Sequence, residues 1–351
     1  MSMQPLSTPA LIVDLDVFEA NVAAMKRMLE GTGKTVRPHV KTHRTPELAK
    51  RQLGGPVAGV TCATVGEAEA MVAAGIADVL IANEVVDPAK LARLAQLARQ
   101  AKVTVAADHP GPVAQLSRAA VEAGATVNVL VDVDIMLHRC GVSSVDEAMS
   151  LGRAIAVADG LRLAGLMGYE GRLRREADDR EGRIARAYRM LGEIKSALEA
   201  EGFEIAIVSG GGTSTLREAL VDPNITEVQA GVYALMEPQL LDMDLPFRCA
   251  VTVRGTVISR HPGRFVTDVG RRVVGMEYGP PAPVGFGGAP VAISDEHATV
   301  TVDGATPALG STVDFIPGQI RTTFNLHDRV WVSRGGNIFD CWPVTARGAS
   351  Q

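Results

Sequence analysis

Lys41 is the residue whose type and position most directly indicate chemistry. It lies in the segment VRPHVKTHRTPE, residues 36–47, which reads as the end of a buried strand running into a helix. The same segment carries four other basic or imidazole side chains, Arg37, His39, His43 and Arg44. Neighbouring cations disfavour the ammonium form of a lysine and so favour its nucleophilic amine. This indicates Schiff-base formation with an aldehyde cofactor; the alternative is a solvated loop lysine.

A second motif, VSGGGTS at residues 208–214, has the composition of a phosphate site. It reads as a strand that ends in glycines and continues into a helix with hydroxyl side chains. The backbone N–H groups of such a turn can cradle a phosphate, although glycine runs also form plain tight turns. Together with a lysine at a strand end, the motif predicts pyridoxal phosphate, with its phosphate near five residues: Ser209, Gly210, Gly211, Gly212 and Thr213.

Three further side chains follow predicted strands. Arg139, in DVDIMLHRCGV, could hold a cofactor oxygen or a substrate carboxylate. Tyr169, in LMGYEG, could stack on a ring or move a proton, and Tyr233, in EVQAGVY after Gly231, has the same options. The structural alternative for these residues is a surface arginine and half-buried tyrosines.

The elements that must position these side chains alternate in type from about residue 10 to 235. Short β-branched runs lie at 10–15, 34–40, 59–64, 78–83, 102–107, 126–133, 161–169, 204–210 and 225–231. Between them, apolar residues recur at steps of three and four, which indicates amphipathic helices. A series of β-α units predicts a parallel TIM-type (β/α)8 barrel. A doubly wound sheet is the rival, but no GxGxxG follows the first strand.

After about residue 245 the pattern becomes strand-rich, as in RCAVTVRGTVISR (248–260) and DRVWVSRGG (328–336), with Gly, Pro and Asp turns. The sequence therefore predicts an α/β protein with two domains. A barrel over residues 1–245 binds the cofactor, and a β domain over residues 246–351 follows it.

The composition excludes several classes of protein. Of the 351 residues, 46% are apolar and 21% charged, as in a globular protein. The net charge of −5 gives no general attraction to nucleic acid. No apolar stretch reaches the roughly 18 residues of a membrane span, and no signal peptide is evident at the N-terminus. Four scattered cysteines fit a reducing cytosol, so we expect a cytoplasmic protein.

The motifs, taken in order, resemble the D-threonine aldolase and D-serine dehydratase family, within the alanine-racemase-like pyridoxal-phosphate enzymes. They include TPALIVDLDVFEANVAAM, RPHVKTH, RCGV, SGGGT, EVQAGVY and FNLHD, and they extend over nearly the whole chain. The resemblance implies a homodimer in which the partner helps to close each active site. It also implies the cofactor aldehyde on Lys41, the phosphate on SGGGT with AGVY nearby, and Arg139 and Tyr169 beside the cofactor. His39 or His43 could touch the cofactor as well.

One segment departs from the family pattern. Where the family has a divalent-metal pair, this chain reads FIPGQIRTTFNLHD, with Gln319 and Arg321 at the two ligand positions. A glutamine amide is a poor ligand for such a cation, and a permanently charged guanidinium cannot be one. We therefore expect no metal there. The family metal is expected to bind the 3-hydroxyl of the substrate, so another group must do this work.

Three interpretations remain open. In the first, Arg321 replaces the metal as a fixed cation, and His138 could act as a base; the substrate is a D-3-hydroxy amino acid, possibly with a second anionic group. Aldol cleavage to glycine and an aldehyde is preferred over dehydration. In the second, Lys41 and Tyr169 act on opposite faces of the α-carbon of a racemase substrate. In the third, the protein carries the cofactor without catalysis.

Overall fold

The computed structural model describes residues 6–171 and 178–351. Within these residues the chain divides into two compact units, which we call the barrel unit and the β unit. The barrel unit comprises the described residues of Lys26–Lys41, Leu48–Gly231 and Ala349–Gln351, and the β unit comprises residues 6–25, Thr42–Glu47 and Val232–Gly348. In the part of the chain that the structure describes, no helix is both long and apolar enough to span a bilayer.

The barrel unit is built on eight parallel strands. They are β2 (Thr35–Val36), β3 (Val60–Cys62), β4 (Asp78–Glu84), β5 (Lys102–Ala107), β6 (Val127–Val133), β7 (Leu161–Gly168), β8 (Ile207–Gly210) and β9 (Glu227–Val228). Their order is β2-β9-β8-β7-β6-β5-β4-β3. Parallel bridges from Val36 to Val57 and from His39 to Thr61 join the two edges, which closes the sheet. The predicted TIM-type barrel is confirmed.

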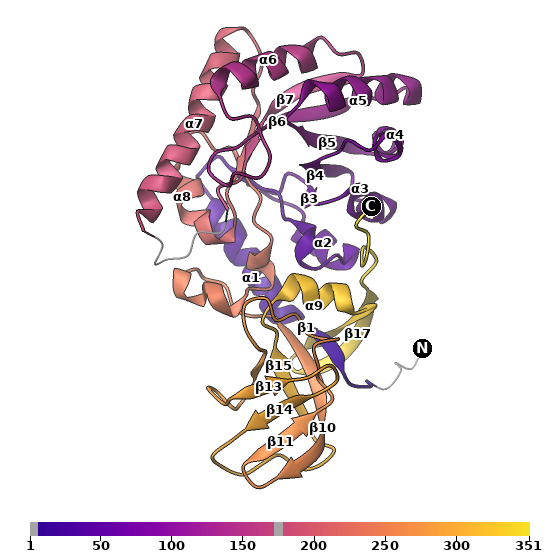
Figure 1. Ribbon diagram of the computed structural model, residues 1–351, viewed down its shortest axis with the longest axis vertical. Helices are drawn as coiled ribbons and strands as arrows, with labels where there is room; N and C mark the ends of the chain where they lie inside the picture. Colours follow the sequence, from indigo (N-terminus) through magenta and orange to yellow (C-terminus); the bar gives the residue numbers. More distant parts are fainter. Residues whose placement is uncertain (1–5, 172–177) are drawn as a thin grey trace. The chain divides into compact units, whose positions relative to one another are not determined.

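Helices surround the strands of the barrel unit (Figure 1). They are α3 (Val65–Ala73), α4 (Pro88–Leu97), α5 (Pro110–Ala123), α6 (Val145–Ala156), α7 (Arg180–Ala200) and α8 (Leu216–Val221). Local signals set their ends: the Thr64 hydroxyl accepts from the Glu67 amide at the start of α3, and Gly124 ends α5 with a φ of 62°. The strands bury valines such as Val103, Val129 and Val208 between the sheet and these helices.

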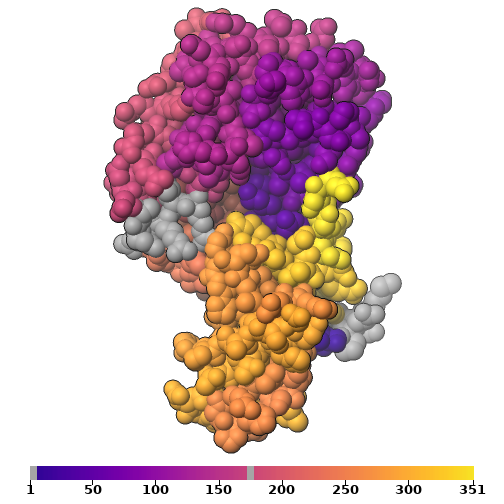
Figure 2. All heavy atoms as spheres, in the orientation of Figure 1, coloured from indigo at the N-terminus to yellow at the C-terminus, as the bar shows by residue number. Residues whose placement is uncertain are grey.

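The residues Ala349–Gln351 belong to the barrel unit and lie at the N-terminus of α3, near the label C in Figure 1. In the space-filling view they form the yellow end that lies against the violet part of the surface (Figure 2). The Gly66 amide donates to the Gln351 carbonyl at 2.9 Å, and the Thr64 hydroxyl donates to the Ala349 carbonyl at 2.6 Å. This segment therefore supplies acceptors for the first turn of α3.

The β unit contains a sheet in the order β13-β14-β11-β10-β1-β16-β17, with β15 paired to β10 and to β12. Its strands are β1 (Ala10–Asp14), β10 (Val251–His261), β11 (Arg264–Thr267), β12 (Ala282–Pro283), β13 (Val291–Ile293), β14 (Ala298–Thr301), β15 (Thr312–Ile316), β16 (Arg329–Arg334) and β17 (Asn337–Pro343). Helix α9 (Ile320–Leu326) follows β15. The predicted strand-rich C-terminal region is confirmed. The remaining α-helices of the described residues are α1 (Leu15–Leu29) and α2 (Pro46–Gln52).

The first strand lies in a different sheet from the one that the β-α alternation suggested. Residues 10–14 do form a strand, but β1 pairs antiparallel with β10 and parallel with β16, so it is central in the β unit. Its pattern of four consecutive buried apolar residues is common to barrel strands and to central strands of any sheet. The local sequence therefore identified the strand but could not identify its partners.

Candidate active site

Several predicted site residues lie at one end of the barrel. Lys41 is half-buried in the single-turn 3-10 helix Val40–Thr42, which follows β2. Tyr169 directly follows β7, and Gly231 follows β9. The segment from Ser209 to Thr213, which we call the glycine loop, begins at the end of β8. Because all eight strands are parallel, these residues share the carboxyl end of the barrel, where active sites of such barrels lie. The strand β9 alone separates β2 from β8 in the sheet.

The glycine loop needs its glycines for close packing. A Cβ on Gly210 would lie 3.0 Å from the carbonyl oxygen of Gly168, in the neighbouring strand β7. Gly211 has a φ of 73°, and a Cβ there would lie 2.8 Å from the Cβ of Ala219 in α8. A Cβ on Gly212 would lie 3.4 Å from Cε2 of Tyr169, so the tyrosine ring packs against the loop. The structure thus brings Tyr169 and the predicted phosphate loop together.

Ser209 anchors the start of this loop inside the barrel. Its hydroxyl donates to Glu227 Oε1 at 2.7 Å and accepts from the side-chain Nε2 of Gln229 at 3.0 Å. The other oxygen of Glu227 accepts from Arg37 Nε at 2.9 Å. Both Glu227 and Gln229 were missed in the sequence, because nothing local to them indicates that β9 lies beside β8.

Arg37 therefore has a structural role. It is 2% exposed and also contacts Asp78 at 2.6 Å. Burial opposes its charge, but Glu227 and Asp78 outweigh burial and raise the pKa of Arg37. Since two carboxylates neutralise this guanidinium, Arg37 does not contribute to the cationic crowding that the sequence suggested around Lys41. His39, in the same segment, is buried, and its backbone amide donates to the Ala230 carbonyl at 3.3 Å.

His138 and Arg139 lie on the loop after β6. The His138 side chain is 86% exposed, and its Nδ1 lies 3.1 Å from Oδ2 of Asp134. The His138 amide donates to the other oxygen of Asp134 at 2.8 Å, and the residue has a φ of 54°. Arg139 is exposed as well. Both residues follow a strand at the carboxyl end of the barrel, and their predicted contacts with cofactor or substrate stay predictions.

The β unit holds the two positions where the family pattern has metal ligands. Gln319 caps α9, since its side-chain oxygen accepts from the Thr322 amide at 3.3 Å. Arg321 Nη2 lies 3.0 Å from the Tyr278 hydroxyl and 3.6 Å from Oε1 of Glu237, which is 1% exposed. The guanidinium carbon lies 5.8 Å from the centre of the Tyr278 ring. These side chains do not fit a divalent cation, because one oxygen is engaged in a helix cap and the other group is itself a cation.

Two other predicted residues are in the β unit. Tyr233 is 1% exposed and its ring centre lies 5.6 Å from that of Phe247. His43 Nδ1 accepts from the Thr45 amide at 3.1 Å, and its ring lies edge-on to Phe324. Arg44 donates to the carbonyl of Arg321 at 2.8 Å. Tyr233 and His43 are buried, Arg44 is half-buried, and the cofactor roles of Tyr233 and His43 stay predictions.

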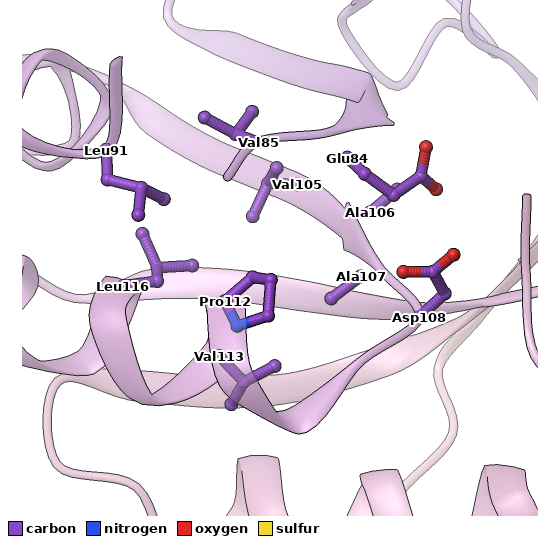
Figure 3. A pocket seen from close by; sticks show the side chains of 10 residues that line it. All are labelled: Glu84, Val85, Leu91, Val105, Ala106, Ala107, Asp108, Pro112, Val113 and Leu116. Carbon is purple, nitrogen blue, oxygen red and sulfur yellow. The ribbon is translucent and has the colours of Figure 1, made fainter. Parts of the chain in front are cut away.

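A carboxylate cluster at the ends of β4 and β5 was also missed. Among residues 6–171 and 178–351, one group of three metal-ligand side chains has its atoms within 4.8 Å of one another: Glu84, Asp108 and Cys140. Figure 3 shows the Glu84 and Asp108 carboxylates on one side of a pocket that apolar side chains line on the other. Asp132, 5% exposed in β6, shares a hydrogen bond with Glu84. Burial, with this hydrogen bond and the charge of Glu84, raises the pKa of Asp132 to about 8. The carboxyl of Asp132 therefore favours its protonated form beside Glu84.

The proton on Asp132 gives a pH-dependent stability. An aspartate has a pKa near 4 in the unfolded chain. Between about pH 4 and pH 8, Asp132 binds more protons in the folded than in the unfolded protein, so its contribution to the free energy of unfolding falls as pH rises, by at most about 1.4 kcal/mol per pH unit. Asp132→Asn should flatten this slope in urea titrations at several pH values. A slope that the substitution leaves unchanged would assign the effect to other groups.

The fold and the site define the alanine-racemase-like class: a parallel barrel with a lysine after a strand and a glycine loop, in one chain with a strand-rich unit. Comparison with known families agrees, since residues 13–238 match the N-terminal domain of alanine racemase and residues 250–333 match a putative serine dehydratase domain. The chain belongs to the D-threonine aldolase and D-serine dehydratase family and is an enzyme of the lyase class.

Similar proteins cover the chain almost from end to end. A D-threonine aldolase from Arthrobacter sp is 40% identical, over 99% of this chain and 94% of the relative. A 3-hydroxy-D-aspartate aldolase from Paracoccus denitrificans (strain Pd 1222) is 33% identical over the same shares of both chains. The crystal structure of D-threonine aldolase from Filomicrobium marinum has a TM-score of 0.94 and 39% identity, and it covers 99% of this chain and 97% of that one.

Proposed function

We propose that this enzyme uses pyridoxal phosphate to cleave a D-3-hydroxy amino acid into glycine and an aldehyde. The observation that carries the proposal is the common position of Lys41, Tyr169 and the glycine loop at the carboxyl end of one closed parallel barrel. The relatives named D-threonine aldolase and 3-hydroxy-D-aspartate aldolase support the choice of substrate class.

The residues present fit this cofactor. Lys41 would hold the aldehyde carbon, and the loop from Ser209 to Thr213 would hold the phosphate on backbone amides and the Thr213 hydroxyl. The loop approaches its surroundings too closely for any Cβ at Gly211, which is expected where backbone itself binds a ligand. When bound, pyridoxal phosphate supplies an electron sink for the charge that bond cleavage leaves at the α-carbon.

The residues of the chain supply binding and proton transfer. Lys41, when its amine is free and protonated, would donate that proton to the α-carbon and so complete glycine. Tyr169 packs against Gly212 and would orient the cofactor ring or hold a proton beside it. Arg139 would bind a substrate carboxylate or a cofactor oxygen through its forked donors. His138, paired with Asp134, remains a candidate base for the 3-hydroxyl proton.

Arg321 is proposed to replace the divalent metal as the cation of this reaction. Two features support it: Glu237 and Tyr278 hold the guanidinium in one place, and Gln319 is committed to the helix cap. A fixed cation stabilises the oxyanion that forms as the 3-hydroxyl loses its proton. A guanidinium also pairs well with a second carboxylate, which 3-hydroxyaspartate would offer. The enzyme is therefore proposed to work without a divalent metal.

Dehydration is the second candidate, because residues 250–333 match a serine dehydratase domain. One experiment tests both reactions. The purified enzyme is incubated with D-threonine, D-phenylserine, D-3-hydroxyaspartate or D-serine, with and without a chelator, and the products are assayed. We expect glycine and aldehyde, unchanged by the chelator. Oxo-acid products would show dehydration, and α-proton exchange without breakdown would show a racemase. Loss of activity with the chelator that Mn²⁺ or Zn²⁺ restores would refute the metal-free reaction.

Substitution of Arg321 should separate charge from shape. Arg321→Gln is expected to lower kcat/KM by about a hundredfold, the effect of losing one oxyanion-stabilising donor. Arg321→Lys should keep part of the activity because it keeps the charge. Tyr278→Phe, the control, loses one hydrogen bond to the guanidinium but keeps the cation. Steady-state kinetics on D-threonine and D-3-hydroxyaspartate checks this, and wild-type activity in Arg321→Gln would contradict it.

The assembly and location are proposed from the family resemblance and the thiols. We propose a homodimer, which sedimentation of the purified protein would test through its mass. The four cysteines are free in the structure, which suits the reducing cytoplasm.

A further inference from the structure

We propose that Glu170 is a positioning residue for the phosphate group of the cofactor, acting through the glycine loop without touching the phosphate. This inference rests on the proposed function, because it presupposes that the loop binds the phosphate of pyridoxal phosphate. It goes further in assigning a role to a carboxylate, a group that a phosphate site would be expected to exclude for its charge.

Glu170 lies between the end of β7 and the loop. It follows Tyr169 in sequence and is 2% exposed. Its Oε1 accepts from the hydroxyl of Thr215, and it also accepts from the Tyr188 hydroxyl of α7 at 3.2 Å. The backbone amide of Gly211 faces the same carboxylate. One buried side chain therefore connects a barrel strand, a barrel helix and the loop.

The hydroxyl of Thr215 passes this constraint on to the loop backbone. It accepts from the Gly212 amide at 3.0 Å while it donates to Glu170. The Thr215 amide in turn donates to the Gly212 carbonyl at 3.3 Å. These bonds fix both ends of the turn at 212–215. The directions of the amides inside the turn are thus set before a ligand arrives.

The loop needs such a constraint because of its composition. Three consecutive glycines have more backbone freedom than any other three residues, so ordering them costs a large amount of conformational entropy. A loop that is already ordered does not lose this entropy again when it binds the phosphate. Arg180 of α7 adds a second restraint, since its Nη2 donates to the Ser214 carbonyl at 2.5 Å. Glu170 is the restraint on the barrel side of the turn.

The surroundings of Glu170 have opposing effects on the ionisation of its carboxyl group. Burial raises the pKa of this carboxyl, while the hydrogen bonds from Thr215, Tyr188 and Gly211 oppose that shift. A glutamine in its place would keep an oxygen that accepts from Thr215 and Tyr188, without any negative charge. Glu170 is therefore proposed to act as a hydrogen-bond acceptor that is held in one position. The isosteric glutamine should preserve both the acceptor and its position.

The test compares two ligands that differ only in the phosphate. Dissociation constants of pyridoxal phosphate and of pyridoxal are measured by equilibrium dialysis for cofactor-depleted wild type, Glu170→Ala and Glu170→Gln. We expect Glu170→Ala to weaken pyridoxal phosphate binding by about ten- to a hundredfold, the effect of losing hydrogen bonds to a carboxylate. Pyridoxal binding should stay within about twofold, since it does not use the loop. Glu170→Gln should bind both ligands nearly as wild type does.

A general loss of structure would have a different signature. It would weaken both ligands together, and such a result, like an unchanged affinity for pyridoxal phosphate in Glu170→Ala, would overturn the inference. Thr215→Val removes the connecting hydroxyl with little change of shape, so it should show the same selective loss even if Glu170→Ala does not fold. Wild-type protein that fails to bind pyridoxal phosphate would instead refute the proposed function.

Discussion

Lys41→Ala is expected to lower aldolase activity by at least about a thousandfold, the order found when a covalent nucleophile is removed. The substitution removes the amine that would hold the cofactor aldehyde at the carboxyl end of the barrel. Borohydride reduction of the wild-type enzyme, followed by digestion and mass spectrometry, should find the cofactor on the peptide that contains Lys41. The variant should carry no such label and should lose the visible absorption of the bound cofactor.

Lys50→Ala serves as the matched control. Lys50 is an exposed lysine of α2, nine positions further along the chain. Its removal should leave both the label and the activity as they are. A label that persists in Lys41→Ala, or one that maps to another lysine of the wild type, would contradict the assignment of Lys41.

Arg37→Met is expected to lower the free energy of unfolding by about 3–5 kcal/mol, more than any other substitution proposed here. The guanidinium is 2% exposed and its partner Glu227 has a side chain 4% exposed, so the substitution leaves a buried carboxylate without its cation. Urea unfolding of the two proteins measures the difference. The double variant Arg37→Met with Glu227→Gln should recover a large part of it, because it removes the stranded charge.

A surface ion pair of the same unit provides the comparison. Arg153 pairs with Glu201 between α6 and the end of α7, with side chains 57% and 34% exposed. Arg153→Met should unfold at nearly the wild-type urea concentration, since exposed pairs contribute little. Equal losses in Arg37→Met and Arg153→Met would show that burial does not decide the strength of these pairs.

Local patterns were sufficient for the parts of the site that depend on local geometry. The glycines at 210–212 were predicted to form a tight turn after a strand, and the structure has one there that is too close to its neighbours for side chains at Gly210 and Gly211. Lys41 was predicted as a site residue because it follows a strand in a series of β-α units, and strand ends in such a barrel share one face; the structure places it at that face. Both inferences needed only the identity and order of nearby residues.

The residues that were missed depend on pairs that are distant in sequence. Arg37 read as one more cation near Lys41, because its partner Glu227 lies 190 residues further along the chain. Glu170 looked unremarkable beside Tyr169, since its acceptor role appears only when the turn at 212–215 folds against it. The course of the loop from Asp134 to Arg139, which leaves His138 exposed, is likewise set by hydrogen bonds to Asp134. Periodicity carries no information on such contacts.

The place of β1 has a consequence for how the protein is made. Ala10 pairs with Arg254, and Ile12 pairs with Trp331, so the central strand of this sheet leaves the ribosome long before either neighbour exists. An apolar segment with unpaired edges must then wait, during which it is prone to aggregate or to bind chaperones. For the same reason, a fragment that starts near residue 246 would lack the middle of its own sheet. Expression of this C-terminal fragment alone should yield insoluble protein. Co-expression of a segment that contains residues 6–14 should improve its solubility.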